Sequence, residues 1–120
     1  MRRANLIGLC LVLAAAAHSR PAVAAFAIAF DPATGHAAAF NGTFDLEQAK
    51  RTALSNCGGG CRVVAAGKKT CAAVVESISS GVSVWAVGQG TTAGVAASNG
   101  WHSCRRKGGV ICTAAAAICD

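Results

Sequence analysis

Six of the seven cysteines carry the most specific chemistry in this sequence, and they fall into two groups of three. The groups are Cys57, Cys61 and Cys71, followed by Cys104, Cys112 and Cys119. Zinc sites favour paired ligands about two to four residues apart, a spacing that Cys57 and Cys61 have but Cys104 and Cys112 lack. Thiol redox catalysis favours a Cys-x-x-Cys pair beside a helix N-terminus, and the sequence has no such pair. We therefore expect disulfides, with no metal and no cofactor.

The two groups of cysteines repeat each other along the chain. Corresponding members are 47, 51 and 48 residues apart, which predicts an internal duplication with a short insertion in the second copy. Six cysteines allow fifteen pairings, and the sequence alone does not choose among them. Pairings that survive exchange of the copies respect the duplication, and among these we favour Cys57–Cys61, Cys104–Cys112 and Cys71–Cys119. The first two would each tie a helix end to the next strand, and the third would join the copies.

His36 and His102 are the candidates for acid–base chemistry beyond the N-terminal segment. Catalysis by either one would need a nucleophile, an orienting group and a donor for the developing charge within reach. The sequence around His102 offers no carboxylate, and a histidine at a helix end has a structural role through its interaction with the helix dipole. No catalytic residue is predicted.

Basic side chains gather in two short clusters, Lys68-Lys69 and Arg105-Arg106-Lys107. Without the N-terminal segment, eight basic and five acidic side chains give a net charge of +3. Nucleic-acid binding is not predicted, because it would need a broader basic face and stacking aromatics, and the chain has no Tyr. We expect both clusters to contact a partner protein or an acidic envelope polymer. The oligomeric state stays open.

The N-terminal segment has the three parts of a secretory signal peptide. Arg2 and Arg3 precede an apolar run at residues 6–17, and small residues follow up to Ala25. The run is too short to cross a bilayer, which needs about 20 apolar residues. We expect residues 1–25 to be a signal peptide cleaved after Ala24 or Ala25. The mature protein would then be exported to the periplasm or the extracellular space, without a membrane span.

Turn residues and hydrophobic periodicity indicate the elements of the first copy. An alternating strand at 26–30, an Asp-Pro-Ala-Thr-Gly turn at 31–35 and a return strand at 36–40 predict a hairpin. Asp45 is expected to cap a helix, with Gln48 in the capping-box position, and three consecutive glycines end that helix before Cys61.

The remaining elements follow the same pattern with more glycine. Residues 62–66 and 71–76 flank Gly67-Lys68-Lys69 and predict a second hairpin. A strand at 82–87, a helix capped by Thr91 or Thr92 and running to Cys104, and strand residues at 111–118 complete the chain.

Both helices are expected to have an apolar face in the same phase. Leu46, Ala49, Ala53, Leu54 and Cys57 recur at helical spacing, and adding 47 gives Ala93, Ala96, Gly100, Trp101 and Cys104. Gly94 and Gly100 each weaken the second helix by up to about 1 kcal/mol, which predicts a short or irregular helix.

These elements predict one disulfide-stapled α+β domain over residues 26–120, with antiparallel sheet and two helices. The expected element order is β-β-α-β-β followed by β-α-β-β, in two degenerate repeats at about 26–78 and 79–120. The core is rich in Ala and Val, so burial contributes little per residue. Three disulfides at about 2–4 kcal/mol each would match the net stability of a small domain, about 5–15 kcal/mol.

The chain resembles the small exported bacterial proteins of domain-of-unknown-function family 4189. The resemblance lies in Phe-Ala-Ile-Ala-Phe at 26–30, Pro-Ala-Thr-Gly at 32–35, Ala-Leu-Ser-Asn-Cys at 53–57, Cys-Arg-Val-Val from Cys61 and Thr-Cys-Ala-Ala from Thr70. It covers most of residues 26–119. Family members usually end the second helix with Ala-Leu-x-x-Cys, whereas this chain has Gly-Trp-His-Ser-Cys at 100–104. The resemblance implies an interaction role outside the cytoplasm and carries no catalytic residues.

The functional prediction is a non-enzymatic binding or effector module outside the cytoplasm. An inhibitor or immunity protein against a cell-wall hydrolase is the alternative, because small disulfide-rich folds suit that role by analogy. A small enzyme is the third hypothesis.

Overall fold

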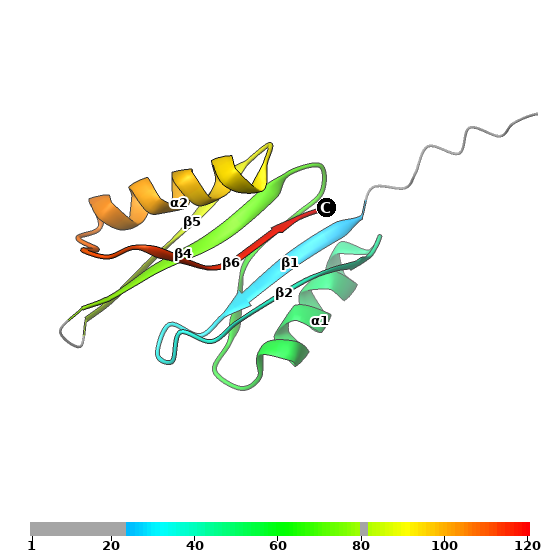
Figure 1. Ribbon diagram of the computed structural model, residues 1–120. Helices are drawn as coiled ribbons and strands as arrows, with labels where there is room; N and C mark the ends of the chain where they lie inside the picture. Colours follow the sequence, from blue (N-terminus) through cyan, green and yellow to red (C-terminus); the bar gives the residue numbers. More distant parts are fainter. Residues whose placement is uncertain (1–23, 80–81) are drawn as a thin grey trace, which may run out of the picture.

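Two three-stranded antiparallel sheets, each with one helix, make up the computed structural model, which describes residues 24–79 and 82–120 (Figure 1). The first sheet has the strand order β2-β1-β3 and the second has β5-β4-β6. In chain order the elements are β1 (Ala25–Phe30), β2 (Ala37–Thr43), α1 (Leu46–Cys57), β3 (Arg62–Gly67), β4 (Cys71–Ser79), β5 (Val82–Gly90), α2 (Ala93–Arg106) and β6 (Thr113–Cys119). The predicted class, an α+β fold with antiparallel sheet and two helices, is confirmed.

The two sheets are built by the same β-β-α-β unit used twice. Each unit's first strand lies in the centre of its sheet, paired on one side with the second strand and on the other with the strand after the helix. One β-bulge recurs at equivalent positions: β1 shifts register against β3 between Ile28 and Ala29, and β4 shifts against β6 between Val74 and Val75. The shift of β1 against β2 between Ala25 and Ala27 has no counterpart in the pairing of β4 with β5. A β-bulge is a specific structural feature, so its recurrence at equivalent positions strongly supports duplication.

The boundary between the repeats differs from the expected one. Residues 62–66 and 71–76 do not form a hairpin, because β3 lies at the edge of the first sheet and β4 in the centre of the second. The first repeat therefore ends with β3, and the second begins with β4 instead of near residue 79. Gly67-Lys68-Lys69 does reverse the chain, with Lys69 at φ 59°, but a turn sequence does not specify which sheet the next strand joins.

The first predicted hairpin is confirmed. β1 pairs with β2, and the intervening turn is closed by backbone hydrogen bonds from Asp31 N to His36 O (2.8 Å) and from Gly35 N to Asp31 O (2.8 Å). Gly35 has φ 75°, a left-handed conformation that glycine adopts without strain.

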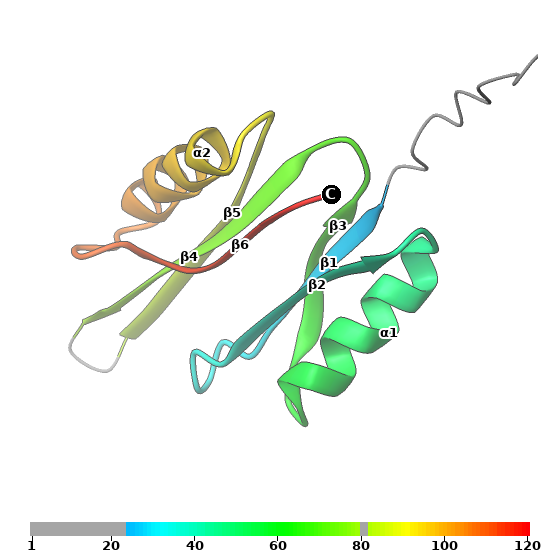
Figure 2. The ribbon, with the colours of Figure 1, turned by 45° about the vertical axis from the view of Figure 1, so that its right-hand side comes forward.

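Alternation along the central strands separates the helix-facing side chains from those between the sheets. In β1 the alanines face α1, while Phe26, Ile28 and Phe30 pack with Ala72 and Val74 of β4. The result is four layers in the order helix, sheet, sheet, helix (Figure 2). All six β1 residues are buried, because both faces of the strand are covered.

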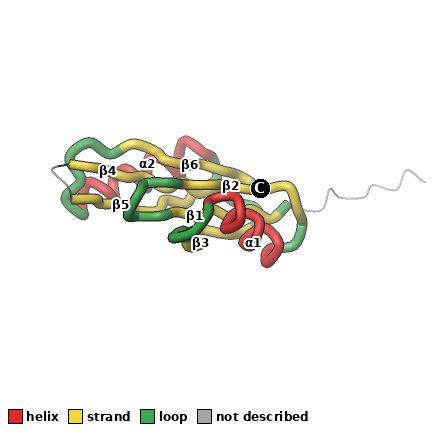
Figure 3. Tube along the Cα trace, turned by 90° about the horizontal axis from the view of Figure 1, so that it is seen from below, coloured by secondary structure: helices red, strands yellow, loops and turns green. Residues whose placement is uncertain are grey.

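The sheets also meet at one edge. β2 lies beside β6, where the Asn41 side-chain amide donates to the Cys119 carbonyl at 3.0 Å (Figure 3). Sheet-to-sheet packing and this edge contact hold the two repeats together.

Both helices begin at the predicted caps. Asp45 Oδ1 accepts from the Glu47 and Gln48 amides at 2.9 and 3.3 Å, which satisfies free donors of the first turn. The Gln48 side chain bonds the Thr43 hydroxyl instead of returning to the Asp45 amide. In α2 the cap is Thr92, whose hydroxyl accepts from the Val95 amide at 3.1 Å.

The second helix is longer and more regular than its glycines predicted, since α2 has 14 residues and α1 has 12. Gly100 allows α2 to pack closely against β4, because a Cβ at this position would lie 2.7 Å from Val75 Cγ2. A Cβ on Gly88 of β5 would overlap the backbone of Ala96 and Gly100. The small residues bring α2 close against the sheet, and this packing offsets the low helix propensity.

Three of the residues predicted on the apolar face of each helix are buried. Ala49, Ala53 and Cys57 are buried in α1, and Ala96, Gly100 and Cys104 are buried in α2. Trp101 was expected on the same face and is instead 43% exposed. Its counterpart Leu54 packs against the α1 core, so the two helices differ at this position.

The three disulfides are Cys57–Cys61, Cys71–Cys119 and Cys104–Cys112, the pairing that the duplication favoured. The expectation that Cys71–Cys119 joins the repeats is wrong. These cysteines are register partners on the adjacent strands β4 and β6, within the second repeat. The register of β1 and β3 places Ala25 and Lys68 at the equivalent positions, so the offset of 48 residues does not reflect the duplication. Between the described residues, no disulfide crosses from one repeat to the other.

The predicted signal peptide lies almost wholly outside the described residues, which begin at Ala24. Within the part of the chain that the structure describes, neither helix has the length and apolar character needed to cross a bilayer.

Candidate functional site

The connection between α2 and β6 is held in place at both ends by buried groups. Cys104, the last buried residue of α2, is bridged to Cys112, so residues 105–111 form a closed loop. The buried Ser77 hydroxyl of β4 accepts from the Val110 and Ile111 amides, both at 3.2 Å. These bonds fix the loop backbone on the end of the second sheet.

Two of the three basic residues in this loop stabilise the fold. Arg105 Nη1 donates to the Val110 carbonyl at 2.6 Å, and its guanidinium lies 5.6 Å from the Trp101 ring centre. Lys107 Nζ donates to the Trp85 carbonyl at 3.1 Å and lies 5.6 Å from the Trp85 ring centre. Arg106 is exposed, and its side chain makes no hydrogen bond or ion pair with any described residue.

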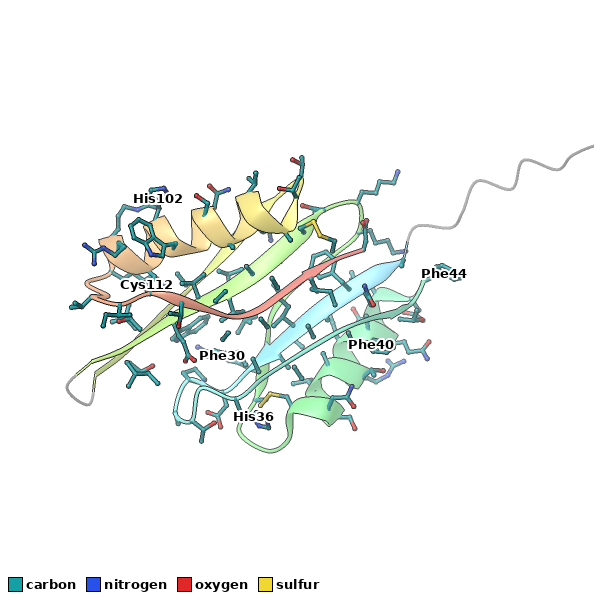
Figure 4. The ribbon with its side chains drawn as sticks, viewed as in Figure 1. Phe30, His36, Phe40, Phe44, His102 and Cys112 are labelled. Atoms are coloured by element: carbon teal, nitrogen blue, oxygen red, sulfur yellow. A yellow bond between two sulfur atoms is a disulfide. The ribbon has the colours of Figure 1, made fainter. Side chains whose placement is uncertain are left out.

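Apolar side chains on the same loop face outward. Val110 is 62% exposed and Ile111 is 71% exposed. Together with Trp101 and the two arginines they form what we call the loop surface: Trp101, Arg105, Arg106, Val110 and Ile111. Figure 4 shows this end of the molecule around the labelled His102 and Cys112. Contiguous exposed apolar residues on a rigid support are typical of interaction sites.

The first repeat has nothing comparable at the equivalent place. Three glycines, Gly58 to Gly60, connect Cys57 and Cys61, whereas seven residues connect Cys104 and Cys112. Cβ atoms on Gly58 and Gly59 would meet no other atom within 4 Å, and none of the three glycines presents a side chain to solvent. The four extra residues of the second repeat therefore lie in the loop that carries the exposed apolar and basic side chains.

The other predicted contact cluster, Lys68 and Lys69, lies apart from the loop surface. The lysines precede Cys71, which pairs with Gly90 at the end of the sheet where α2 begins. Arg105 to Lys107 lie where α2 ends, and a helix of 14 residues is roughly 21 Å long. The structure does not combine the two basic clusters into one patch.

The two histidines are not brought together either. His36 lies in the turn before β2, while His102 lies on the exposed side of α2 with its ring edge-on to Trp101 at 5.1 Å (Figure 4). Within residues 24–79 and 82–120 there is no cavity and no cluster of three or more His, Cys, Asp or Glu side chains that could hold a metal ion.

A cluster of side chains around Trp85, where the two sheets meet, was not predicted from the sequence. The Trp85 ring lies 5.4 Å from the Phe30 ring and 5.1 Å from the Arg62 guanidinium, so it contacts the first repeat through both. The carboxylate of Glu76, the register partner of Trp85, has a buried Oε2 with no hydrogen-bond partner among the described residues. No sequence signal identified the cluster, because it depends on how the sheets stack.

Comparison with protein families gives one match, to a family model described as "Domain of unknown function (DUF4189)", over residues 25–119. The chain belongs to this family. No curated protein and no solved structure matches it. The DUF4189 match spans every described helix and strand. Trp101, where this chain departs from the expected Ala-Leu-x-x-Cys helix ending, is one of the residues of the loop surface.

Proposed function

We propose that this protein is an exported, non-enzymatic binding module that contacts its partner through the loop surface. The observation that carries the proposal is the outward exposure of Val110 and Ile111 on a loop whose backbone is fixed by Ser77 and closed by Cys104–Cys112. Exposed apolar side chains on a flexible loop lose entropy on binding, whereas a preformed loop has already met that cost on folding.

Charge supports an acidic partner. The sequence from Ser77 to Cys119 contains no Asp or Glu, so every charged side chain on α2 and its loop is basic. An acidic envelope polymer or an acidic patch on a protein would both be attracted to this end of the molecule.

Export is supported by the three disulfides, which persist in oxidising compartments, and by the signal-peptide pattern of residues 1–25. Of the two cleavage positions, we favour the one after Ala24, because Ala25 is the fully buried first residue of β1 and pairs with Thr43.

Inhibition of a cell-wall hydrolase is the second candidate function. A closed, rigid loop with an apolar end could enter the substrate cleft of such an enzyme, and Cys104–Cys112 provides the closure. Recovery of one hydrolase with the protein at equal stoichiometry would favour this function over binding to an envelope polymer.

A pull-down of envelope components with the oxidised, exported protein tests the proposal. Arg106→Ala is the cleanest variant, because Arg105 and Lys107 also hold the fold. Lys68→Ala is the matched control, since it removes one exposed positive charge far from the loop surface. We expect Arg106→Ala to weaken capture by about fivefold at low salt, with less effect at high salt. Equal capture by wild type and Arg106→Ala, or an equal loss with Lys68→Ala, would remove the loop surface as the site.

A further inference from the structure

The backbone amides of the loop donate hydrogen bonds within the protein. The Val110 and Ile111 amides donate to Ser77, the Val110 carbonyl accepts from Arg105, and the Gly109 amide donates to the Cys104 carbonyl at 2.9 Å. The groups left for a partner are mainly apolar side chains and the charge of Arg106. Protein–protein interfaces usually add about one hydrogen bond per 100–200 Å², and the backbone amides of residues 107–111 already donate within the protein.

The same composition suits the interfacial region of a bilayer. Aliphatic side chains can enter the boundary between headgroups and acyl chains, and a Trp ring is favourable at headgroup level. Positive charges are attracted to anionic headgroups, and every charged side chain on α2 and its loop is basic. A soluble polyanion would use the charges but gain nothing from exposed Val110 and Ile111.

We infer that the loop surface docks onto an anionic lipid surface, with Val110 and Ile111 inserted between the headgroups and Trp101 and Arg106 at headgroup level. This inference rests on the proposed function, because it names the acidic partner of the same surface. The occupant is a lipid surface because apolar exposure and positive charge coincide on one end of the molecule while the loop's backbone amides donate within the protein.

Co-sedimentation with lipid vesicles tests the inference, using oxidised protein recovered after export, with its mass checked for loss of the leader. The probes are vesicles of phosphatidylglycerol and phosphatidylcholine in equal amounts, vesicles of phosphatidylcholine alone, and soluble polyphosphate. We expect binding to the anionic vesicles to exceed binding to the neutral ones by at least about tenfold.

Matched variants locate the contact. The double variant Val110→Ser with Ile111→Ser is expected to lose at least about tenfold in binding to anionic vesicles. Phe44→Ser removes an apolar side chain that is 61% exposed at the far end of the molecule (Figure 4), and it should bind like wild type. Trp101→Leu, which installs the residue found at the equivalent position 54, should abolish the lipid-induced blue shift of tryptophan fluorescence while keeping the fold.

Three outcomes would overturn the inference. Vesicle binding that is insensitive to the Val110/Ile111 double variant, or equally sensitive to Phe44→Ser, would exclude this docking mode. Binding to polyphosphate without binding to anionic vesicles would exclude a lipid surface and leave the proposed function standing. Failure to bind vesicles and polyphosphate, combined with an empty envelope pull-down, would overturn the proposed function as well.

Discussion

The two repeats have the same element order, the same strand pairing and a β-bulge at the same place, yet they end their helices differently. After α1 three glycines lead to Cys61, and Leu54 packs inward. After α2 a seven-residue loop leads to Cys112, and Trp101 faces outward. The comparison suggests that the first repeat retains the structural role of the unit while the second carries an added surface.

The repeats also contribute differently to the interface between them. The first supplies the large side chains of β1, Phe26, Ile28 and Phe30, and the second supplies Ala72 and Val74 from the equivalent strand. Because no disulfide joins the repeats among the described residues, this interface and the edge contact between β2 and β6 must hold them together.

Truncation of the interface should give the largest effect. Phe26 is fully buried, so Phe26→Ala should lower the free energy of unfolding by about 3–5 kcal/mol. Phe44→Ala changes the same residue type at an exposed position and should stay within about 0.5 kcal/mol. Denaturant unfolding monitored by circular dichroism measures both. Similar losses for the two variants would contradict the role of the interface.

The disulfides of the two repeats should contribute differently to the free energy of unfolding. Cys71–Cys119 closes a loop with a sequence separation of 48, whereas Cys57–Cys61 has a separation of 4. In the loop-closure model their removal costs about 4 and about 2 kcal/mol, respectively. Paired Cys→Ala variants, unfolded in denaturant without reductant, test the order. A larger loss on removal of Cys57–Cys61 would reverse the comparison.

A smaller difference in stability between the repeats is expected for substitutions that affect how the helices pack. Gly88→Ala places a methyl group against the backbone of α2 and should cost about 1–3 kcal/mol. Gly59→Ala, after α1, meets open space and should change stability by no more than about 0.5 kcal/mol. Thermal unfolding of the two variants compares them directly. A tolerated Gly88→Ala would mean that α2 can move away from the sheet.

Local rules predicted much of this fold from the sequence. The turn after β1, the caps Asp45 and Thr92 and the disulfides Cys57–Cys61 and Cys104–Cys112 depend on residues near in sequence. Cys71–Cys119 depends on the pairing of β4 with β6 and was reached through a spacing that the duplication does not explain. The boundary between the repeats depends on which sheet β4 joins, and Gly67-Lys68-Lys69 does not encode that choice.

The same limit applies to the candidate site. The basic cluster at residues 105–107 was identified from its charges, but the exposure of Trp101 was not, since its helical phase indicated burial. The internal use of Lys107 depends on a tertiary contact with the Trp85 carbonyl, and that of Arg105 on how the closed loop folds back toward its Val110 carbonyl. Sequence patterns located the charged segment, and the structure was needed to determine which side chains face outward.

Whether any disulfide joins the two repeats can be measured directly by peptide mapping. The non-reduced, denatured protein is cut with a protease that cleaves after lysine. Cleavage after Lys50, Lys68, Lys69 and Lys107 divides the six disulfide-bonded cysteines among three peptides. We predict that peptide 51–68 is released alone with one internal disulfide, and that peptides 70–107 and 108–120 remain covalently joined. Recovery of peptide 51–68 attached to either of the others would show a disulfide between the repeats and contradict the account.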